Sequence, residues 1–265
     1  MFADAAAYER FMGRWSAVLA PAFVDAVFDP SPGGAPPAVV LDLGCGTGNL
    51  SAELLDRWPG TRVVAVDPAP AFVTAAAARL PADRARVVVG SAMDLPEPDG
   101  SVDAALAMLV LNFVPDPAVG VLEMRRVTRP GGVVGAAVWD YGGGMAMLRT
   151  FWDAAAAVHP GARAVDEALA APARAGGVEV LFTGACLVGV EGGLVEVPME
   201  FPSFDDYWDP FLGGVGPAGD FVRALDDGGR EALRLELERR LGAAPVRMTS
   251  TARWVRGTVP AGSAG

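Results

Sequence analysis

The chain lacks three residue types: it contains no lysine, no isoleucine and no glutamine. All 21 basic residues are therefore arginines. Without lysine the protein cannot form a Schiff base, and it cannot build a phosphate loop that depends on a lysine side chain. The abundance of Ala, Gly, Pro, Arg and Val that accompanies these absences is typical of a bacterial gene from a GC-rich genome and says little about function.

Cysteine and histidine are also scarce. The chain has two cysteines, Cys45 and Cys186, and one histidine, His159. These numbers exclude a cysteine-rich zinc cluster and a disulfide framework, so we expect no metal site and a reducing, cytoplasmic setting. His159 is followed by Pro160 and Gly161 at the expected end of a helix, where a histidine is more often a C-terminal cap than a catalyst.

Positive charge is limited, because 32 acidic residues outnumber the 21 arginines and the formal net charge is −11. A non-specific nucleic-acid binder needs a basic surface that releases phosphate counterions, so we expect no nucleic-acid partner. The longest stretches without a charged residue are 12 residues, 30–41 and 104–115, whereas about 18 apolar residues are needed to span a bilayer. We therefore expect a soluble protein without a membrane partner. The sequence gives no signal for the oligomeric state.

The hydrophobic pattern predicts alternating strands and helices. With 265 residues, 52% of them hydrophobic, the chain can bury the core of one large domain. Short β-branched runs predict strands at Ala38–Leu43, Arg62–Asp67, Arg86–Gly90, Ala104–Val110 and Val133–Trp139. Helical spacing between them predicts helices at 49–58, 70–80 and 117–127. Continuous apolar strands separated by helices are typical of a parallel sheet that is covered on both faces.

Further elements are expected at the two ends of the chain. Apolar residues at helical spacing predict a helix over 8–28, and 29–37 is a linker rich in proline and glycine. Later helices are expected at 145–158, 163–175 and 178–185, and strands at 187–200 and 248–256. Between those strands lies an insertion, 201–247, which begins with aromatic residues and ends with a charged helix over 228–241.

The most informative motif follows the first expected strand. Residues 39–50 read VVLDLGCGTGNL, so a hydrophobic strand leads directly into a loop with glycines at 44, 46 and 48. Glycines at such a turn permit positive φ and let a ligand approach bare backbone. The G-x-G-x-G spacing differs from the G-x-G-x-x-G of dinucleotide-binding folds, because Asn49 stands where the third glycine would be. The loop also lacks the G-K-[ST] of a phosphate loop, so it predicts close contact with a ligand without a pyrophosphate site.

An acidic residue, Asp67, ends the next expected strand, 23 residues after Gly44. An acid at this point of a strand–helix–strand unit can accept hydrogen bonds from both hydroxyls of a ribose. Taken singly, the glycines could form an ordinary tight turn and Asp67 could cap a helix. The order of strand, loop, helix, strand and acid together favours a cofactor site.

These motifs resemble the class I S-adenosylmethionine-dependent methyltransferases of the type found in ubiquinone and menaquinone biosynthesis. The resemblance is close over about residues 8–141 and looser elsewhere. The matching motifs are Asp42–Gly48, Val66–Pro68, Gly90–Pro96, Ser101–Phe113 and, as the turn before the fifth strand, Arg129–Gly132. The resemblance implies an enzyme that binds S-adenosylmethionine as its cofactor and transfers a methyl group to a small-molecule acceptor.

The fold implied by this resemblance is a doubly wound, seven-stranded, mostly parallel sheet with its last strand reversed, the Rossmann-like methyltransferase fold. Within a single domain of residues 1–265, residues 1–37 would form an N-terminal cap helix and linker. Residues 38–141 would form the cofactor-binding core, and 201–247 a substrate lid inserted before the last strand.

The resemblance also assigns cofactor contacts. Asp67 and Pro68 would hold the ribose, Met93 would pack on the adenine, and Leu109 would lie below the methionine moiety. Ser91 stands where relatives often carry an acid, so its hydroxyl or the neighbouring backbone would contact the adenine amino group. The N-terminal helix would close over the cofactor, with an arginine that can pair with a carboxylate. The full set is Tyr8, Arg14, Asp42, Gly44, Cys45, Gly46, Asp67, Pro68, Ser91, Ala92, Met93 and Leu109.

Acceptor and catalytic residues are expected at the ends of the fourth and fifth strands and in the lid. Many relatives carry histidine near position 112, whereas this chain has Asn112, so we expect no histidine base. Catalysis would then depend on alignment of the acceptor and exclusion of water. The catalytic candidates are Asn112, Asp140 and Tyr141, and the substrate-binding candidates are Trp139, Phe204, Tyr207, Trp208 and Phe211. Aromatic residues at helical spacing, such as those of the lid, are also usual in a core.

The expected function is methyl transfer to a small, largely apolar or aromatic metabolite, such as one of secondary metabolism. Three alternatives stay open. An NAD-dependent oxidoreductase is disfavoured by the glycine spacing, and a nucleic-acid methyltransferase by the negative charge. A catalytically inactive S-adenosylmethionine-binding protein is compatible with the sequence, because no single residue is obligatory for catalysis by alignment.

Overall fold

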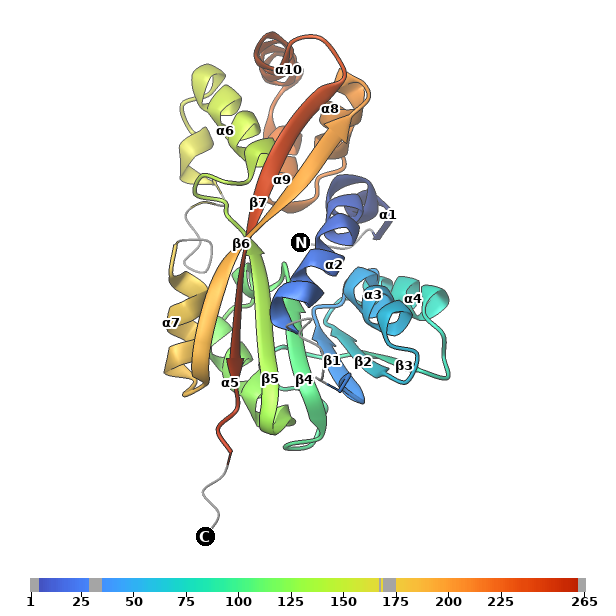
Figure 1. Ribbon diagram of the computed structural model, residues 1–265. Helices are drawn as coiled ribbons and strands as arrows, with labels where there is room; N and C mark the ends of the chain where they lie inside the picture. The colour runs from blue at the N-terminus through green and yellow to red at the C-terminus, as the bar shows by residue number, and fades with distance from the viewer. Residues whose placement is uncertain (1–4, 29–34, 167, 169–174, 262–265) are drawn as a thin grey trace.

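The computed structural model describes residues 5–28, 35–166, 168 and 175–261, and it is built around one seven-stranded sheet (Figure 1). The strand order is β3-β2-β1-β4-β5-β7-β6. β7 runs antiparallel to β5 and β6, whereas all other pairs of neighbouring strands are parallel, so the expected sheet with one reversed strand is confirmed. The strands are β1 (Val39–Leu43), β2 (Arg62–Asp67), β3 (Ala85–Val89), β4 (Val102–Met108), β5 (Thr128–Trp139), β6 (Val188–Phe201) and β7 (Val246–Thr258).

Helices cover both faces of the sheet. On one face lie α2 (Arg14–Val27), α3 (Asn49–Arg57) and α4 (Pro70–Arg79), and on the other α5 (Pro117–Val127) and α7 (Gly177–Gly184). Successive strand residues point to opposite faces, so Val40 packs with the first group and Leu41 with the second. Because both faces are buried, the central strands read as continuous apolar runs rather than as alternating ones.

The N-terminal segment crosses the sheet edge where β1 and β4 end. It consists of α1 (Ala5–Tyr8), a π-helical turn η1 (Glu9–Gly13) and α2, which follow one another without a break. The buried face of α2 includes Leu19, Phe23 and Val27, which are at most 1% exposed. The predicted helix over 8–28 is thus present, and its first turns are those nearest to the glycine loop.

The insertion between β6 and β7 forms a helical group above the sheet. It contains α8 (Phe204–Leu212), α9 (Gly216–Ala224) and α10 (Asp227–Leu241), and it packs against α6 (Ala146–Val158) from the β5–β6 connection. Figure 1 shows β6 and β7 running past the ends of the other strands into this group. Phe211 of α8 stacks on Phe151 of α6 at 4.4 Å between ring centroids and meets Phe11 of η1 edge-on at 5.2 Å. The insertion therefore contacts the N-terminal segment as well as α6.

Two sequence expectations differ from the structure or fall outside it. The turn expected at Arg129–Gly132 lies inside β5, which begins already at Thr128, and only Gly131 has positive φ. Residues 167 and 169–174 of the helix expected at 163–175 lie outside the described residues. Of the residues described there, Arg163 and Ala164 belong to a 3-10 turn, Ala162–Ala164, and Ala168 also has 3-10 geometry. Among the described residues, no helix has both the length and the apolar character needed to cross a bilayer.

Candidate active site

A cavity of about 470 Å³ opens at the carboxyl ends of β1, β2 and β4. Open α/β sheets bind their ligands at this edge, where the strand order reverses. Nine of the twelve residues expected to contact a cofactor line the cavity. They are Tyr8, Gly44, Gly46, Asp67, Pro68, Ser91, Ala92, Met93 and Leu109.

The glycine loop forms the floor of this cavity and requires its glycines for two different reasons. Gly44, Gly46 and Gly48 all have positive φ, at +67°, +53° and +86°. A Cβ on Gly44 would lie 2.3 Å from Cγ2 of Val110, so the close packing of β1 against the end of β4 leaves no room for a side chain. A Cβ on Gly46 would meet only a Tyr8 ring carbon at 3.9 Å. Gly46 therefore leaves bare backbone facing the cavity.

Asp67 brings a buried carboxylate to the cavity wall. Its Oδ2 accepts the N–H of Gly46 at 3.0 Å and its Oδ1 accepts the N–H of Ala69 at 2.8 Å. Burial raises the pKa of Asp67 above its ordinary value, and these two backbone bonds oppose the rise. An ionised carboxylate can accept about four hydrogen bonds, so it retains capacity for donors from a ligand.

Beside the glycine loop lies a recess of about 20 Å³ that Asp42 and Cys45 line together with Tyr8. Ser51 donates to Oδ2 of Asp42 at 2.6 Å, and burial raises the pKa of Asp42 to about 7. Burial also raises the pKa of the Cys45 thiol, which keeps it protonated and unreactive. Asp42 and Cys45 thus lie next to the main cavity rather than in its wall.

A polar network attaches the N-terminal segment to the glycine loop. Thr47 Oγ1 donates to Glu9 Oε2 at 3.0 Å, and Asn49 Nδ2 donates to the Gly13 carbonyl at 3.1 Å and to Ser16 Oγ at 2.9 Å. These bonds hold Tyr8 over the cavity. Burial, followed by the nearby Glu9 charge, raises the pKa of the Tyr8 hydroxyl, which therefore stays neutral.

Arg14, the arginine expected to reach the cofactor, lies elsewhere. Its Nη1 donates to Asp206 of α8 at 2.9 Å, and its guanidinium stacks over Trp15 and Phe201 at 4.4 and 4.9 Å from the ring centroids. It is not among the residues that line the cavity. In this structure its role is to join α2 to the lid.

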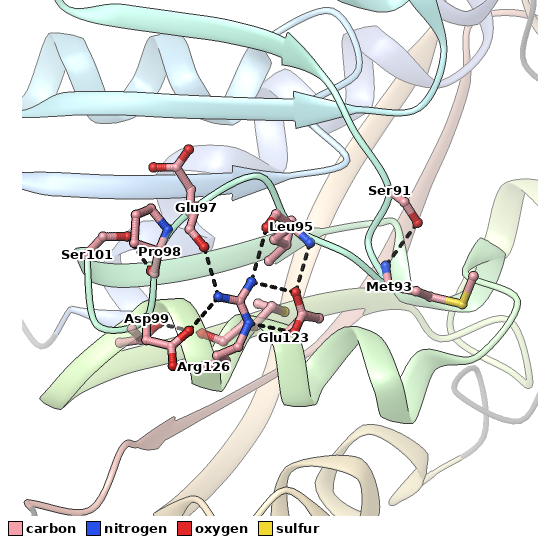
Figure 2. Close-up of polar contacts among 11 residues, drawn as sticks. Ser91, Met93, Leu95, Glu97, Pro98, Asp99, Ser101, Glu123 and Arg126 are labelled. Atoms are coloured by element: carbon pink, nitrogen blue, oxygen red, sulfur yellow. Dashed lines mark hydrogen bonds and ion pairs between the residues drawn. The ribbon is translucent and has the colours of Figure 1, made fainter.

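Ser91, Ala92 and Met93 line the cavity after β3, within a segment, 90–99, that α5 holds in place (Figure 2). Ser91 Oγ accepts the N–H of Met93 at 3.1 Å, which shapes the turn next to the cavity. Arg126 donates to the Leu95 carbonyl at 3.1 Å and to the Glu97 carbonyl at 2.9 Å. Glu123 accepts from Arg126 at 2.7 Å and from the Leu95 N–H at 2.8 Å. The pair therefore fixes the loop that carries Ser91 and Met93.

A second, smaller pocket of about 30 Å³ adjoins the cavity on the lid side. Tyr8, Leu109 and Phe113 line both spaces and so form the boundary between them. Leu109 has φ +64° although it is not a glycine, and its N–H donates to the Ala137 carbonyl at 2.7 Å. Strained backbone of this kind concentrates at functional sites.

Trp139 and Tyr141, two residues expected near the acceptor, line this second pocket with Leu148 of α6 and Gly216 and Pro217 of α9. The aromatic residues of α8 lie elsewhere. Tyr207 is fully buried and donates to the Met147 carbonyl at 2.8 Å, and burial raises the pKa of its hydroxyl. Phe204, Tyr207, Trp208 and Phe211 line neither space: the last three are buried in the interior of the insertion, and Phe204 lies half-buried beside Tyr207.

The other catalytic candidates lie outside both spaces. Asn112 is half-buried in a short 3-10 helix, η2 (Leu111–Phe113), whose last residue reaches the cavity. The Asp140 carboxylate pairs with Arg253 of β7 at 3.3 Å, and the Asp140 backbone carbonyl accepts N–H bonds in a turn. His159 follows α6 as its C-terminal cap, and its Nδ1 accepts the Gly161 N–H at 3.2 Å.

Comparison with known proteins finds a family match for the central part of this chain. Residues 41–135 match the sequence model of the family described as "Methyltransferase domain". This segment runs from β1 to β5 and includes the glycine loop, Asp67 and the loop that Arg126 holds.

Residues 41–135 form a methyltransferase domain.

The resemblance to class I S-adenosylmethionine-dependent methyltransferases is thereby confirmed. This chain is 46% identical over 101 residues to an uncharacterized methyltransferase of Mycobacterium tuberculosis, a match that covers 38% of this chain and 39% of that protein. It is 40% identical over 99 residues to trans-aconitate 2-methyltransferase of Azoarcus sp., over 37% of each protein. The chain thus aligns with about two fifths of the length of these relatives.

The whole chain shares its fold with solved methyltransferases. A phosphoethanolamine N-methyltransferase of Haemonchus contortus, in complex with phosphomonomethylethanolamine and S-adenosylhomocysteine, superposes with a TM-score of 0.60 at 14% identity. That match covers 97% of this chain and 57% of the other. The fold therefore extends beyond the segment that is similar in sequence.

Several residues of the candidate site were not found from the sequence. Phe72 lines the cavity from the first turns of α4 and packs on Tyr8 at 5.2 Å between ring centroids. Because Phe72 lies only five residues after Asp67, its position in the sequence could have predicted that it lies near the cavity. Gly216 and Pro217 carry no such signal, because only the tertiary arrangement of α9 brings them to the second pocket.

The ion pair of Arg126 with Glu123 leads to a testable prediction. Arg126→Met removes the bonds to the Leu95 and Glu97 carbonyls, so the loop carrying Ser91 and Met93 should loosen. We expect about 1–3 kcal/mol less stability in urea unfolding and about three- to tenfold weaker S-adenosylhomocysteine binding by calorimetry. The matched control is Arg125→Met on the same helix, where we expect little change. Equal affinities for both variants would show that the loop does not depend on Arg126.

Proposed function

We propose that this protein transfers a methyl group from S-adenosylmethionine to a small, largely apolar or aromatic acceptor. The observation that carries the proposal is that two spaces lie side by side at the end of β4. One is walled by the bare glycine backbone and the Asp67 carboxylate, and the other by aromatic side chains. A cofactor in the larger cavity would reach their shared boundary of Tyr8, Leu109 and Phe113, and an acceptor would approach that boundary from the side of the smaller pocket, whose volume of about 30 Å³ admits only part of it.

The residues around the larger cavity fit the cofactor chemically. Asp67 offers acceptor capacity for ribose hydroxyls at a buried position, and those bonds would offset the desolvation that raises its pKa. Gly46 leaves its backbone open to a ligand. The cofactor, when bound, supplies a methyl group that its sulfonium already activates for displacement.

The chain's own contribution to the reaction would be alignment and exclusion of water. Positioning of two reactants can lower a barrier by about 7–11 kcal/mol. Lysine does not occur in the chain, and its single histidine, His159, caps α6. The proposal therefore includes no histidine or lysine base. It favours acceptors that lose their proton late or to water, such as an activated carbon, a neutral amine or an acidic hydroxyl.

Asp67 provides the test of the cofactor site. Asp67→Ala removes charge-assisted hydrogen bonds worth roughly 1.5–3 kcal/mol each, so S-adenosylhomocysteine should bind at least about tenfold more weakly in calorimetry. Asp83→Ala, at an exposed position between α4 and β3, is the control that should bind as the parent does. Unchanged affinity in Asp67→Ala would refute the assignment. Binding of NAD in place of S-adenosylhomocysteine would favour the oxidoreductase.

The acceptor can be sought with a methyl-labelled cofactor and a mixture of small metabolites. We expect label in a neutral, aromatic or apolar product. Cofactor binding without transfer to any member of a broad mixture would instead favour an inactive S-adenosylmethionine-binding protein.

A further inference from the structure

Gly13 lies within a helical segment, yet its backbone does not require a glycine. It is the last residue of η1, with φ −57° and ψ −42°, values that any L residue adopts in a helix. Glycine is less stable than alanine inside a helix, because it loses more conformational freedom on folding. The reason for a glycine at this position must therefore lie in its surroundings.

The carboxylate of Glu9 occupies the place that a side chain at residue 13 would need. A Cβ on Gly13 would lie 1.6 Å from Glu9 Oε2 and 2.3 Å from Glu9 Cδ. Residues four apart lie on the same face of a helix, which is why these two meet. Since the clash is with the end of a flexible side chain, a Cβ at residue 13 would displace the carboxylate and leave the backbone in place.

The oxygen that would be displaced is the one that binds the glycine loop. Thr47 Oγ1 donates to Glu9 Oε2 at 3.0 Å, and Thr47 directly follows Gly46. The other carboxylate oxygen, Oε1, lies 4.0 Å from Arg79 Nη1, and both side chains are more than two-fifths exposed, so this ion pair adds little. The hydrogen bond from Thr47 is therefore the contact that Gly13 makes possible.

The segment that carries Glu9 contributes to the walls of both spaces. Tyr8, which precedes Glu9, lines the larger cavity and the second pocket. Phe11 and Met12, which follow it, line the second pocket. One contact with the glycine loop thus bears on the walls of the cofactor cavity and of the second pocket.

A separate attachment, from Asn49, holds this segment at its other end. Asn49 Nδ2 donates to the Gly13 carbonyl and to Ser16 Oγ, at the junction of η1 and α2. The helix α2 itself packs on α3 and on the sheet. Loss of the Glu9 contact would therefore free the turns before Gly13 while α2 stays in place.

We propose that Glu9 is a positioning residue of the methyl-transfer site. Its hydrogen bond from Thr47 docks residues 5–12 on the glycine loop, and this docking places the wall that the two spaces share. The inference rests on the proposed function. It adds one contact through which the loop that meets the cofactor also shapes the acceptor side.

Two substitutions at Glu9 test this hydrogen bond. Glu9→Ala removes the acceptor, whereas Glu9→Gln keeps an oxygen that can accept from Thr47. Amide hydrogen exchange over residues 5–13 of the cofactor-free protein, followed by mass spectrometry, measures the docking. We expect exchange about three- to tenfold faster in Glu9→Ala and within about twofold of the parent in Glu9→Gln. Because Tyr8 is part of the cavity wall, S-adenosylhomocysteine should bind Glu9→Ala about three- to tenfold more weakly in calorimetry, and Glu9→Gln as it binds the parent.

Gly13→Ala tests the same contact without a change to Glu9 or Thr47. In the Glu9→Ala background, this substitution can act only through helix propensity and should slow exchange over residues 5–13. In the parent it also displaces the carboxylate. Its effect on the exchange rate should therefore differ between the two backgrounds by about three- to tenfold.

Arg10→Ala is the matched control, because it removes a charge from an exposed side chain on the same turn, and it should exchange and bind as the parent does. Three results would overturn the inference: Glu9→Ala matches the parent in exchange or in affinity, Glu9→Gln behaves as Glu9→Ala, or Gly13→Ala has the same effect in both backgrounds. Each leaves the proposed function standing if the parent binds S-adenosylhomocysteine. Failure of the parent to bind it would contradict the proposed function itself, and the inference with it.

Discussion

Gly44→Ala is expected to lower the free energy of unfolding by about 2–5 kcal/mol. Gly44 has φ +67°, where an L residue with a Cβ costs about 1–2 kcal/mol. The new Cβ would also lie 2.3 Å from Val110 Cγ2 and 2.7 Å from Val110 Cβ, and relief of such overpacking costs typically about 1–3 kcal/mol more. Urea unfolding without added cofactor measures the loss.

Gly46→Ala is the matched control for this prediction. Gly46 has φ +53°, so the backbone cost is similar, but its Cβ would meet only Tyr8 at 3.9 Å. We expect a loss of about 1–2 kcal/mol, and Val110→Ala added to Gly44→Ala should recover part of the difference. Equal losses at the two glycines would show that contact with Val110 is not what requires Gly44.

The central strands of the sheet, β1, β2 and β4, were predictable because each is buried on both faces. β2 occupies the same residues, Arg62–Asp67, that the apolar run predicts. The start of β5 is irregular. Pro130, Gly131 and Gly132 predict a turn, and the pairing with β4 is interrupted here: Thr128 lies opposite Val102 and Val133 opposite Ala104, so residues 129–132 bulge out of the ladder, with Gly131 at positive φ. The Gly131 N–H donates to the Val259 carbonyl, and this tertiary bond holds the bulge beside the end of β7.

The cofactor half of the candidate site was more accessible to sequence reasoning than the acceptor half. The glycine loop follows β1, Asp67 is the last residue of β2 and Ser91 comes two residues after β3, and parallel strands bring their carboxyl ends to one edge. The second pocket is instead assembled from α6, α9 and η1, which are distant in the sequence.

Aromatic spacing does not distinguish a pocket from a lid core. The residues with the clearest helical spacing, such as Tyr207 and Phe211, are in the core. Arg14 shows that the partner of a charged side chain is equally hard to predict from sequence spacing. Its guanidinium was expected at the cofactor, whereas Asp206, 192 residues later in the chain, pairs with it. No local pattern indicates such a partner.

Asp42→Asn is expected to change how stability depends on pH. Burial raises the pKa of Asp42 in the folded protein to about 7, hydrogen bonds from Ser51 oppose the rise, and the Asp67 charge adds to it. In the unfolded chain the pKa is near 3.8. From about pH 4 to 7 the unfolded chain therefore releases this proton while the folded protein keeps it, so the free energy of unfolding falls as pH rises.

The size of this effect follows from the pKa difference. At about 1.4 kcal/mol per pKa unit, Asp42 removes up to about 4 kcal/mol of stability between pH 4 and 8. The asparagine side chain of the variant cannot ionise, and its amide oxygen can still accept from the Ser51 hydroxyl. Relative to the parent, Asp42→Asn should therefore gain stability steadily with pH, as measured by urea unfolding of the cofactor-free protein across this range.

Asp103→Asn is the control with the opposite sign. Burial alone would raise the pKa of Asp103, but hydrogen bonds from Arg129 and from the Val39 and Ala38 N–H groups lower it below its ordinary value. Its stabilising contribution is present above about pH 4 and is lost as pH falls, so Asp103→Asn should be less stable than the parent at pH 8 and approach it at low pH. Parallel profiles for Asp42→Asn and the parent would mean that Asp42 is ionised in the folded protein throughout this range, and that Ser51 and the recess around it solvate the charge.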